Sequence, residues 1–63
     1  MSIAPDAWKA VTHGSNWKNR KTGAACIVQS TAAGMWDKVR LLHQSGRVTV
    51  KQVHYFLYDF KPA

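Results

Sequence analysis

Few side chains in this sequence are of the types that carry out catalysis. The chain of 63 residues has three aspartates, at positions 6, 37 and 59, and no glutamate. These aspartates are too far apart in the sequence to indicate a pair of carboxylates for general acid–base chemistry. The sequence also shows no pattern in which a nucleophile stands with its base. No glycine-rich segment matches a loop that cradles phosphate groups. We therefore expect a protein that is not an enzyme and needs no cofactor.

Metal ligation is the other chemistry that the residue types allow, because the chain has three histidines and one cysteine. His13, Cys26, His43 and His54 lack the short paired spacings of structural zinc sites, so we expect no metal site. Cys26 stands in an apolar run, which favours a small buried hydrophobe over a reactive thiol. A lone cysteine allows no disulfide within the chain and suits a reducing compartment.

The strongest chemical signal is an excess of positive charge. Nine Lys and Arg residues oppose three acidic residues, which gives a formal net charge of +6 and a pI near 10.0. This balance favours polyanionic partners, with nucleic acid first. The alternative is that the charge only keeps a small protein soluble. We expect a monomer or a weak homo-oligomer.

The clearest structural signal is a hairpin around Gln44-Ser45-Gly46-Arg47. Apolar and polar residues alternate on both sides of it, as in two half-buried strands joined by a two-residue turn. The predicted inward pairs are His43–Val48, Leu41–Val50 and Val39–Gln52. The predicted outward pairs are Leu42–Thr49, Arg40–Lys51 and Lys38–Val53. The turn therefore separates an apolar face from a cationic face.

Basic side chains gather on that outward face and on an earlier loop. Because Arg40 opposes Lys51 in the predicted register, an anionic partner would relieve their repulsion; a solvated face is the alternative. Trp36 shares the face, where its ring would either stack on a base or cover an apolar gap. The candidate nucleic-acid-binding residues are Lys18, Arg20, Lys21, Trp36, Lys38, Arg40, Arg47 and Lys51. Duplex DNA is expected first, with RNA or a single strand as alternatives.

The remaining segments predict a mainly β domain over residues 17–63, preceded by an N-terminal arm or short helix in residues 1–16. A short strand is expected around Trp17, in the core, and a buried strand within residues 24–30. Two interpretations remain open for residues 50–60. The first is a strand followed by a 3₁₀ turn, and the second is one amphipathic helix, because apolar residues also recur there at helical spacing.

Three motifs carry a resemblance to known small proteins. They are Trp17-Lys18-Asn19-Arg20-Lys21-Thr22-Gly23, Val39-Arg40-Leu41-Leu42-His43-Gln44-Ser45-Gly46-Arg47 and Phe56-Leu57-Tyr58-Asp59-Phe60-Lys61-Pro62. With the order of elements, residues 17–62 resemble small SH3-like barrels of Tudor-like and KOW-like type, and short proteins carried by prophages and plasmids. The resemblance implies a barrel of four to five antiparallel strands with a C-terminal 3₁₀ turn. Such barrels bind DNA, RNA, peptides or proteins.

A protein partner is the alternative to nucleic acid. An adaptor, or a mobile-element factor that docks on a host protein, would use Tyr55 and Tyr58 with Trp8 or Trp36 as anchors, because aromatic residues are enriched in binding hot spots. The sequence shows neither a signal-peptide pattern nor an apolar run of about 20 residues. We expect a cytoplasmic protein without membrane contact.

Overall fold

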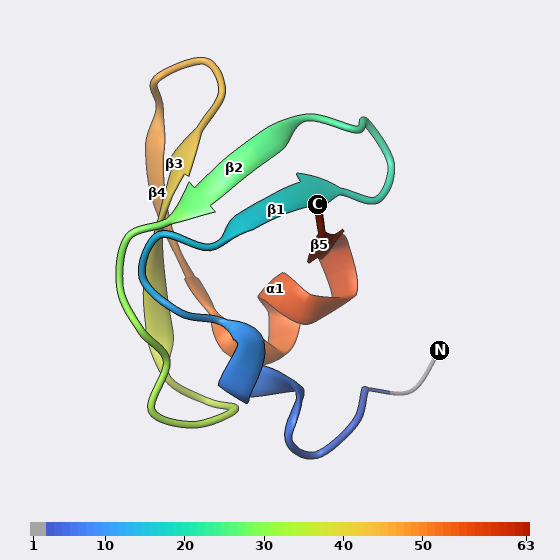
Figure 1. Ribbon diagram of the computed structural model, residues 1–63, viewed down its shortest axis with the longest axis vertical. Helices are drawn as coiled ribbons and strands as arrows, with labels where there is room; N and C mark the ends of the chain where they lie inside the picture. Colours follow the sequence, from blue (N-terminus) through green and yellow to red (C-terminus); the bar gives the residue numbers. More distant parts are fainter. Residues whose placement is uncertain (1–2) are drawn as a thin grey trace.

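The computed structural model describes residues 3–63, which form an antiparallel sheet and two short helices (Figure 1). The elements are the 3₁₀ helix η1 (Ala7–Ala10), β1 (Asn16–Asn19), β2 (Ala25–Val28), β3 (Lys38–His43), β4 (Val48–Gln52), α1 (Val53–Asp59) and β5 (Phe60–Pro62). The strand order is β4-β3-β2-β1-β5, and every neighbouring pair is antiparallel. The predicted mainly β class with antiparallel strands is confirmed. Met1 and Ser2 of the predicted N-terminal segment lie outside the described residues.

The sheet is not closed into a barrel, so that part of the prediction is wrong. β4 and β5 are the two edges of the sheet. α1 connects them and packs on the inner face of the sheet, where a closing ladder between the two strands would stand (Figure 1). No helix in residues 3–63 is long and apolar enough to cross a membrane.

The segment that follows β4 also differs from the prediction. The backbone is extended up to Gln52, with φ −69° and ψ 140°, and then enters a seven-residue α-helix rather than a 3₁₀ turn. Each interpretation of residues 50–60 is therefore correct over part of the segment. The β-branched residues Val48, Thr49 and Val50 favour the extended form, whereas burial of an apolar face stabilises α1.

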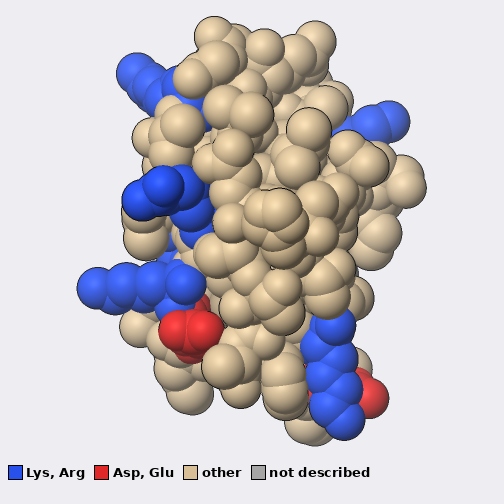
Figure 2. Space-filling model, turned by 60° about the vertical axis from the view of Figure 1, so that its left-hand side comes forward, with Lys and Arg blue, Asp and Glu red and all other residues tan. Residues whose placement is uncertain are grey.

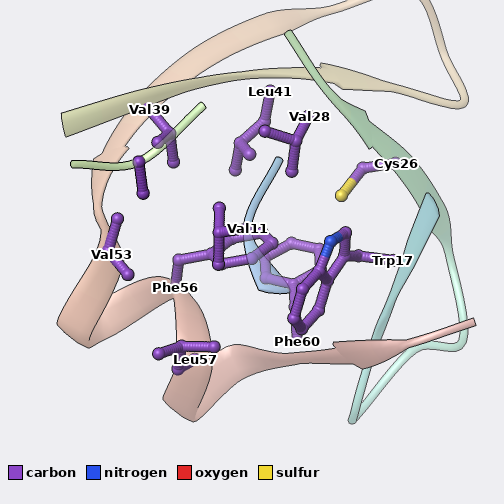
Figure 3. Packing of buried hydrophobic residues seen from close by; sticks show 11 residues of the cluster. Val11, Trp17, Cys26, Val28, Val39, Leu41, Val53, Phe56, Leu57 and Phe60 are labelled. Carbon is purple, nitrogen blue, oxygen red and sulfur yellow. The ribbon is translucent and has the colours of Figure 1, made fainter. Parts of the chain in front are cut away.

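The core lies between the inner face of the sheet and α1, and its side chains converge from both (Figure 3). The strands contribute Trp17, Cys26, Val28, Val39, Leu41 and Phe60. Phe56 of α1 is fully buried, and its ring centroid lies 4.9 Å from that of Trp17, edge-on, and 4.9 Å from that of Phe60, stacked. The predictions that Trp17 belongs to the core and that Cys26 is buried are confirmed.

The β3–β4 hairpin forms where the sequence predicts it, but its register differs by one residue. The structure pairs Leu42 with Val48, Arg40 with Val50 and Lys38 with Gln52. The N–H of His43 donates to the carbonyl of Arg47 over 2.8 Å, and the N–H of Gly46 donates to the carbonyl of His43 over 2.9 Å. Residues 44–46 therefore form a three-residue loop, in which Gly46 takes the left-handed position at φ +91°.

The changed register moves every side chain of β4 to the opposite face. Val48 and Val50, predicted to point inward, are 50% and 61% exposed on the outer face. Lys51, predicted to oppose Arg40 on the outer face, pairs with Val39 and lies on the inner face. Its ammonium group forms an ion pair with Asp59 and lies 5.9 Å from the ring centroid of Phe60, which stabilises this placement.

Replacing Gly46 with alanine tests the three-residue loop. An added Cβ would meet no atom within 4 Å, so the cost arises from the left-handed backbone alone. We expect Gly46→Ala to lower the free energy of unfolding in urea by about 1 kcal/mol. Gly34→Ala is the matched control, because Gly34 also has open space but lacks a positive φ. Equal effects of the two substitutions would contradict the loop geometry.

Candidate functional site

A groove opens on the inner side of the β3–β4 hairpin, at the end of the molecule where the β1–β2 and β3–β4 turns both lie (Figure 1). This hairpin groove has a volume of about 880 Å³. Its lining residues are Asn19, Ala24, Leu41, His43, Gln44, Ser45, Arg47, Thr49, Val50, Lys51 and Phe60. Because β4 and β5 are not paired, nothing in the sheet closes this space.

Asn19 shapes the wall that the β1–β2 turn contributes. Its Oδ1 accepts the N–H of Lys21 over 2.8 Å and the N–H of Thr22 over 3.0 Å. The N–H of Gly23, which has φ +75°, donates to the carbonyl of Asn19 over 2.9 Å. The first sequence motif is therefore a turn motif, and it leaves the side chain of Lys21 exposed beside the groove.

The opposite wall comes from the hairpin and carries the polar side chains. The Nε2 of His43 and the Oγ1 of Thr49 lie 2.6 Å apart and share a hydrogen bond. The ammonium group of Lys51 forms an ion pair with the carboxylate of Asp59. Arg47 is exposed, and no residue among 3–63 forms an ion pair with it. Arg47 is therefore the cation of this wall whose charge is available to a ligand.

The eight predicted nucleic-acid-binding residues do not share one surface. Arg47 and Lys51 line the hairpin groove, and Lys21 belongs to the turn beside it. Lys18, Lys38 and Arg40 lie on the outer face of the sheet. Arg20 reaches the end of α1, and Trp36 lies beside α1. On the face in Figure 2, the Lys and Arg side chains surround a broad uncharged surface. The prediction of one cationic face containing Lys38, Arg40 and Lys51 is wrong, because the register turns Lys51 inward.

Arg20 has a structural contact that the sequence did not reveal. Its Nε donates to the carbonyl of Phe60 over 3.2 Å, and its Nη2 lies 3.5 Å from the carbonyl of Leu57. The last carbonyls of a helix lack partners within the helix and favour a nearby cation. Arg20 thus ties the β1–β2 turn to the end of α1. Some 40 residues separate the partners, so no local pattern could indicate the contact.

The outer face of the sheet carries an aliphatic row that crosses three strands. Ile27 pairs with Leu42, and Leu42 pairs with Val48. Val50, one row further along β4, lies opposite Arg40. We call Ile27, Leu42 and Val48, with Val50 beside them, the aliphatic row. The sequence did not indicate it, because the predicted register placed both valines in the core.

Exposed aromatic rings gather beside α1. The ring of His54 lies 4.5 Å from that of Trp36, 5.4 Å from that of Tyr55 and 5.1 Å from that of Tyr58, measured between centroids. Trp36, Tyr55 and Tyr58 are 61%, 53% and 42% exposed. The predicted surface position of Tyr55 and Tyr58 is confirmed. For Trp36 the sequence left open whether the ring is exposed or covers an apolar gap; the ring is exposed and lies beside His54. The sequence did not indicate that His54 would join them in one aromatic cluster.

Asp37 and Asp59 serve local structure. Asp37 accepts the N–H of Ala33 through Oδ2 and the N–H of Lys38 through Oδ1, both over 3.0 Å, and so orders the loop before β3. Asp59 pairs with Lys51. Within residues 3–63, no three His, Cys, Asp or Glu side chains lie close enough together to hold a metal ion.

No family model matches this chain, and no curated protein or solved structure matches it significantly. Its function is therefore inferred from the chain's own surfaces. The hairpin groove, the aliphatic row and the aromatic cluster are the three that present chemistry to a partner.

The thiol of Cys26 gives a test of the buried-hydrophobe interpretation. Desolvation by burial raises its pKa above the ordinary value of 9.0, and the thiolate is the reactive form. We expect a thiol reagent at neutral pH to leave the folded protein unmodified and to label Cys26 once urea unfolds the chain. Rapid labelling of the folded protein would contradict the burial.

The same shift predicts a pH dependence. Because the pKa is higher in the folded state, the stability linked to Cys26 is fully present below pH 9.0 and is lost as the pH rises through the folded pKa. Urea unfolding at pH values above 9.0 should show a smaller loss of the free energy of unfolding for Cys26→Ala than for the parent chain.

Proposed function

We propose that this protein is a non-enzymatic nucleic-acid-binding module that holds a phosphate backbone across the hairpin groove. The observation that carries the proposal is the meeting of two turns, each with a basic residue, at one groove. Lys21 belongs to the turn between Asn19 and Ala24, which line one wall, and Arg47 lies in the other wall. A groove that two basic turns border suits the phosphates that dominate nucleic-acid affinity.

Duplex DNA is the first choice of ligand. Proteins that bind single strands stack bases on exposed aromatic rings. Phe60, the one phenylalanine of the groove lining, is only 5% exposed, and the exposed rings gather beside α1 instead. The groove therefore offers contacts to a sugar–phosphate backbone rather than to unpaired bases. RNA and single-stranded DNA serve as comparison ligands.

Two further observations support a binding role without catalysis. Asp37 and Asp59 are engaged in a loop and an ion pair, which leaves no carboxylate pair for acid–base chemistry. In addition, the strand order and the helix before the last strand support a relation to SH3-like barrels. We infer that this chain is an open variant of such a barrel. Folds of that kind host many binding functions.

Removing the charge of Arg47 tests the groove. We expect Arg47→Gln to weaken binding to a labelled duplex and to reduce the slope of log K against log salt by about 0.9, the value for one phosphate contact. Fluorescence anisotropy titrations at several salt concentrations measure both quantities. Lys9→Gln is the matched control, because it removes the same charge from exposed η1. No binding of duplex or single strands at low ionic strength, or equal effects of the two variants, would overturn the proposal.

A protein-binding adaptor is the second candidate, and the aromatic cluster favours it. Trp36, Tyr55 and Tyr58 expose their rings on one surface around His54. Large amphipathic rings that cluster in this way are the residues most enriched in binding hot spots.

Truncating one ring of the cluster tests this candidate. We expect Tyr55→Ala to weaken the binding of a protein captured from nuclease-treated lysate by about 2 kcal/mol, measured by calorimetry with the purified partner. Ile27→Ala, which shortens an exposed apolar residue on the sheet, should leave that affinity unchanged. Loss of all captured proteins after nuclease treatment would count against the adaptor.

A further inference from the structure

β4 is an edge strand that carries the charged residue Lys51 but lacks the proline and the short length that protect the other edge of the sheet. The other edge, β5, has three residues and includes Pro62, which has no N–H to offer a new strand. β4 has five residues, Val48–Gln52, without proline. An exposed edge with aliphatic side chains is a template for pairing with another chain.

The hydrogen bonds at both ends of the hairpin show which backbone groups are free. The N–H of Val53 donates to the carbonyl of Asp37, and the N–H of His43 donates to the carbonyl of Arg47, both over 2.8 Å. Bonded pairs alternate along an antiparallel ladder, so the backbone groups of Val48, Val50 and Gln52 point away from β3. Within residues 3–63, no other backbone group bonds the N–H groups of these three residues or the carbonyls of Val48 and Val50. The carbonyl of Gln52, the N-cap of α1, accepts the first hydrogen bond of the helix.

The side chains along this edge have opposite characters on its two faces. On the outer face, the aliphatic row ends at Val48, and the neighbouring Val50 is 61% exposed. On the inner side, Arg47 and Lys51 face the hairpin groove. A strand laid beside β4 would therefore meet apolar surface at every second residue and positive charge at residues between them.

We propose that the free edge of β4 binds an extended segment of an acidic partner protein as a sixth strand. Strand addition gives affinity through main-chain hydrogen bonds and specificity through alternate side chains. Aliphatic residues of the segment would lie opposite Val48 and Val50 and lengthen the aliphatic row. An acidic residue would lie opposite Arg47, whose charge is not paired within residues 3–63. The inference shares Arg47 with the proposed nucleic-acid site, but it rests on the free backbone of β4, which nucleic-acid binding does not use.

Charge decides against a second copy of this chain as the occupant. Each chain carries a net charge of +6, so two copies repel each other. Pairing β4 with its own copy would also crowd Arg47 and Lys51 of both chains along one ladder, and like charges on neighbouring strands destabilise a sheet. An acidic segment meets the same edge with attraction instead.

The test uses the full chain, labelled with ¹⁵N, and the peptide acetyl-Glu-Val-Thr-Val-Glu-amide, whose pattern reads the same in both directions. We expect saturating peptide to shift the amide signals of Val48, Val50 and Gln52. We also expect it to slow their hydrogen exchange by at least about tenfold, because these amides are unbonded in the free chain. The amides of Thr49 and Lys51, already bonded to β3, should change less.

Two controls make the result decisive. The peptide acetyl-Lys-Val-Thr-Val-Lys-amide should leave the exchange rates unchanged, and this control needs no variant of the protein. Val50→Pro removes a free N–H without removing a bond to β3, and it should abolish protection by the glutamate peptide. Shifts without slower exchange would reduce the contact to charge attraction and overturn the proposal. Protection that rises with protein concentration in the absence of peptide would assign the edge to a second copy.

Discussion

Phe56 packs edge-on against Trp17 of β1 and stacks on Phe60 of β5, so that its ring holds the first strand, the helix and the last strand together. A chain of this size buries only about 60% of the surface that its unfolded form exposes, which leaves few apolar contacts in reserve. α1 must therefore cover the inner face of the sheet. That position keeps β4 and β5 apart, and the hairpin groove is the space that remains between them.

The elements of the fold that depend on local sequence were predictable. The strand around Trp17, the buried strand with Cys26 and the hairpin near Gly46 follow from alternation and turn residues. The hairpin register was not predictable, because Ser45-Gly46 suits a two-residue loop as well as the three-residue loop that forms. Alternation in β4 indicates the wrong loop, because Val48 and Val50 lie on the outer face while Thr49 and Lys51 lie on the inner face.

The candidate site was predictable in composition but not in arrangement. Nine basic residues indicated polyanionic partners, yet the register and long-range contacts decide where each charge lies. The register of the hairpin turns Lys51 inward, where it pairs with Asp59, and Arg20 is drawn to the carbonyls at the end of α1. Two of the predicted ligand-binding cations thus stabilise the fold. The sequence does not indicate these roles. The partners of Arg20 are distant in sequence, and the position of Asp59 beside Lys51 depends on the formation of α1.

The pairing of β1 with β5 has a consequence for the order in which the chain acquires its structure. Synthesis proceeds from the N-terminus, and the β1–β2 and β3–β4 hairpins each use neighbouring residues. Trp17, however, is covered by Phe56 and bordered by Pro62, which are made after both hairpins. The nascent chain therefore carries an uncovered indole until residues 56–62 are available. Contacts of such long sequence separation slow folding, and the newly made protein is most vulnerable to aggregation during that interval.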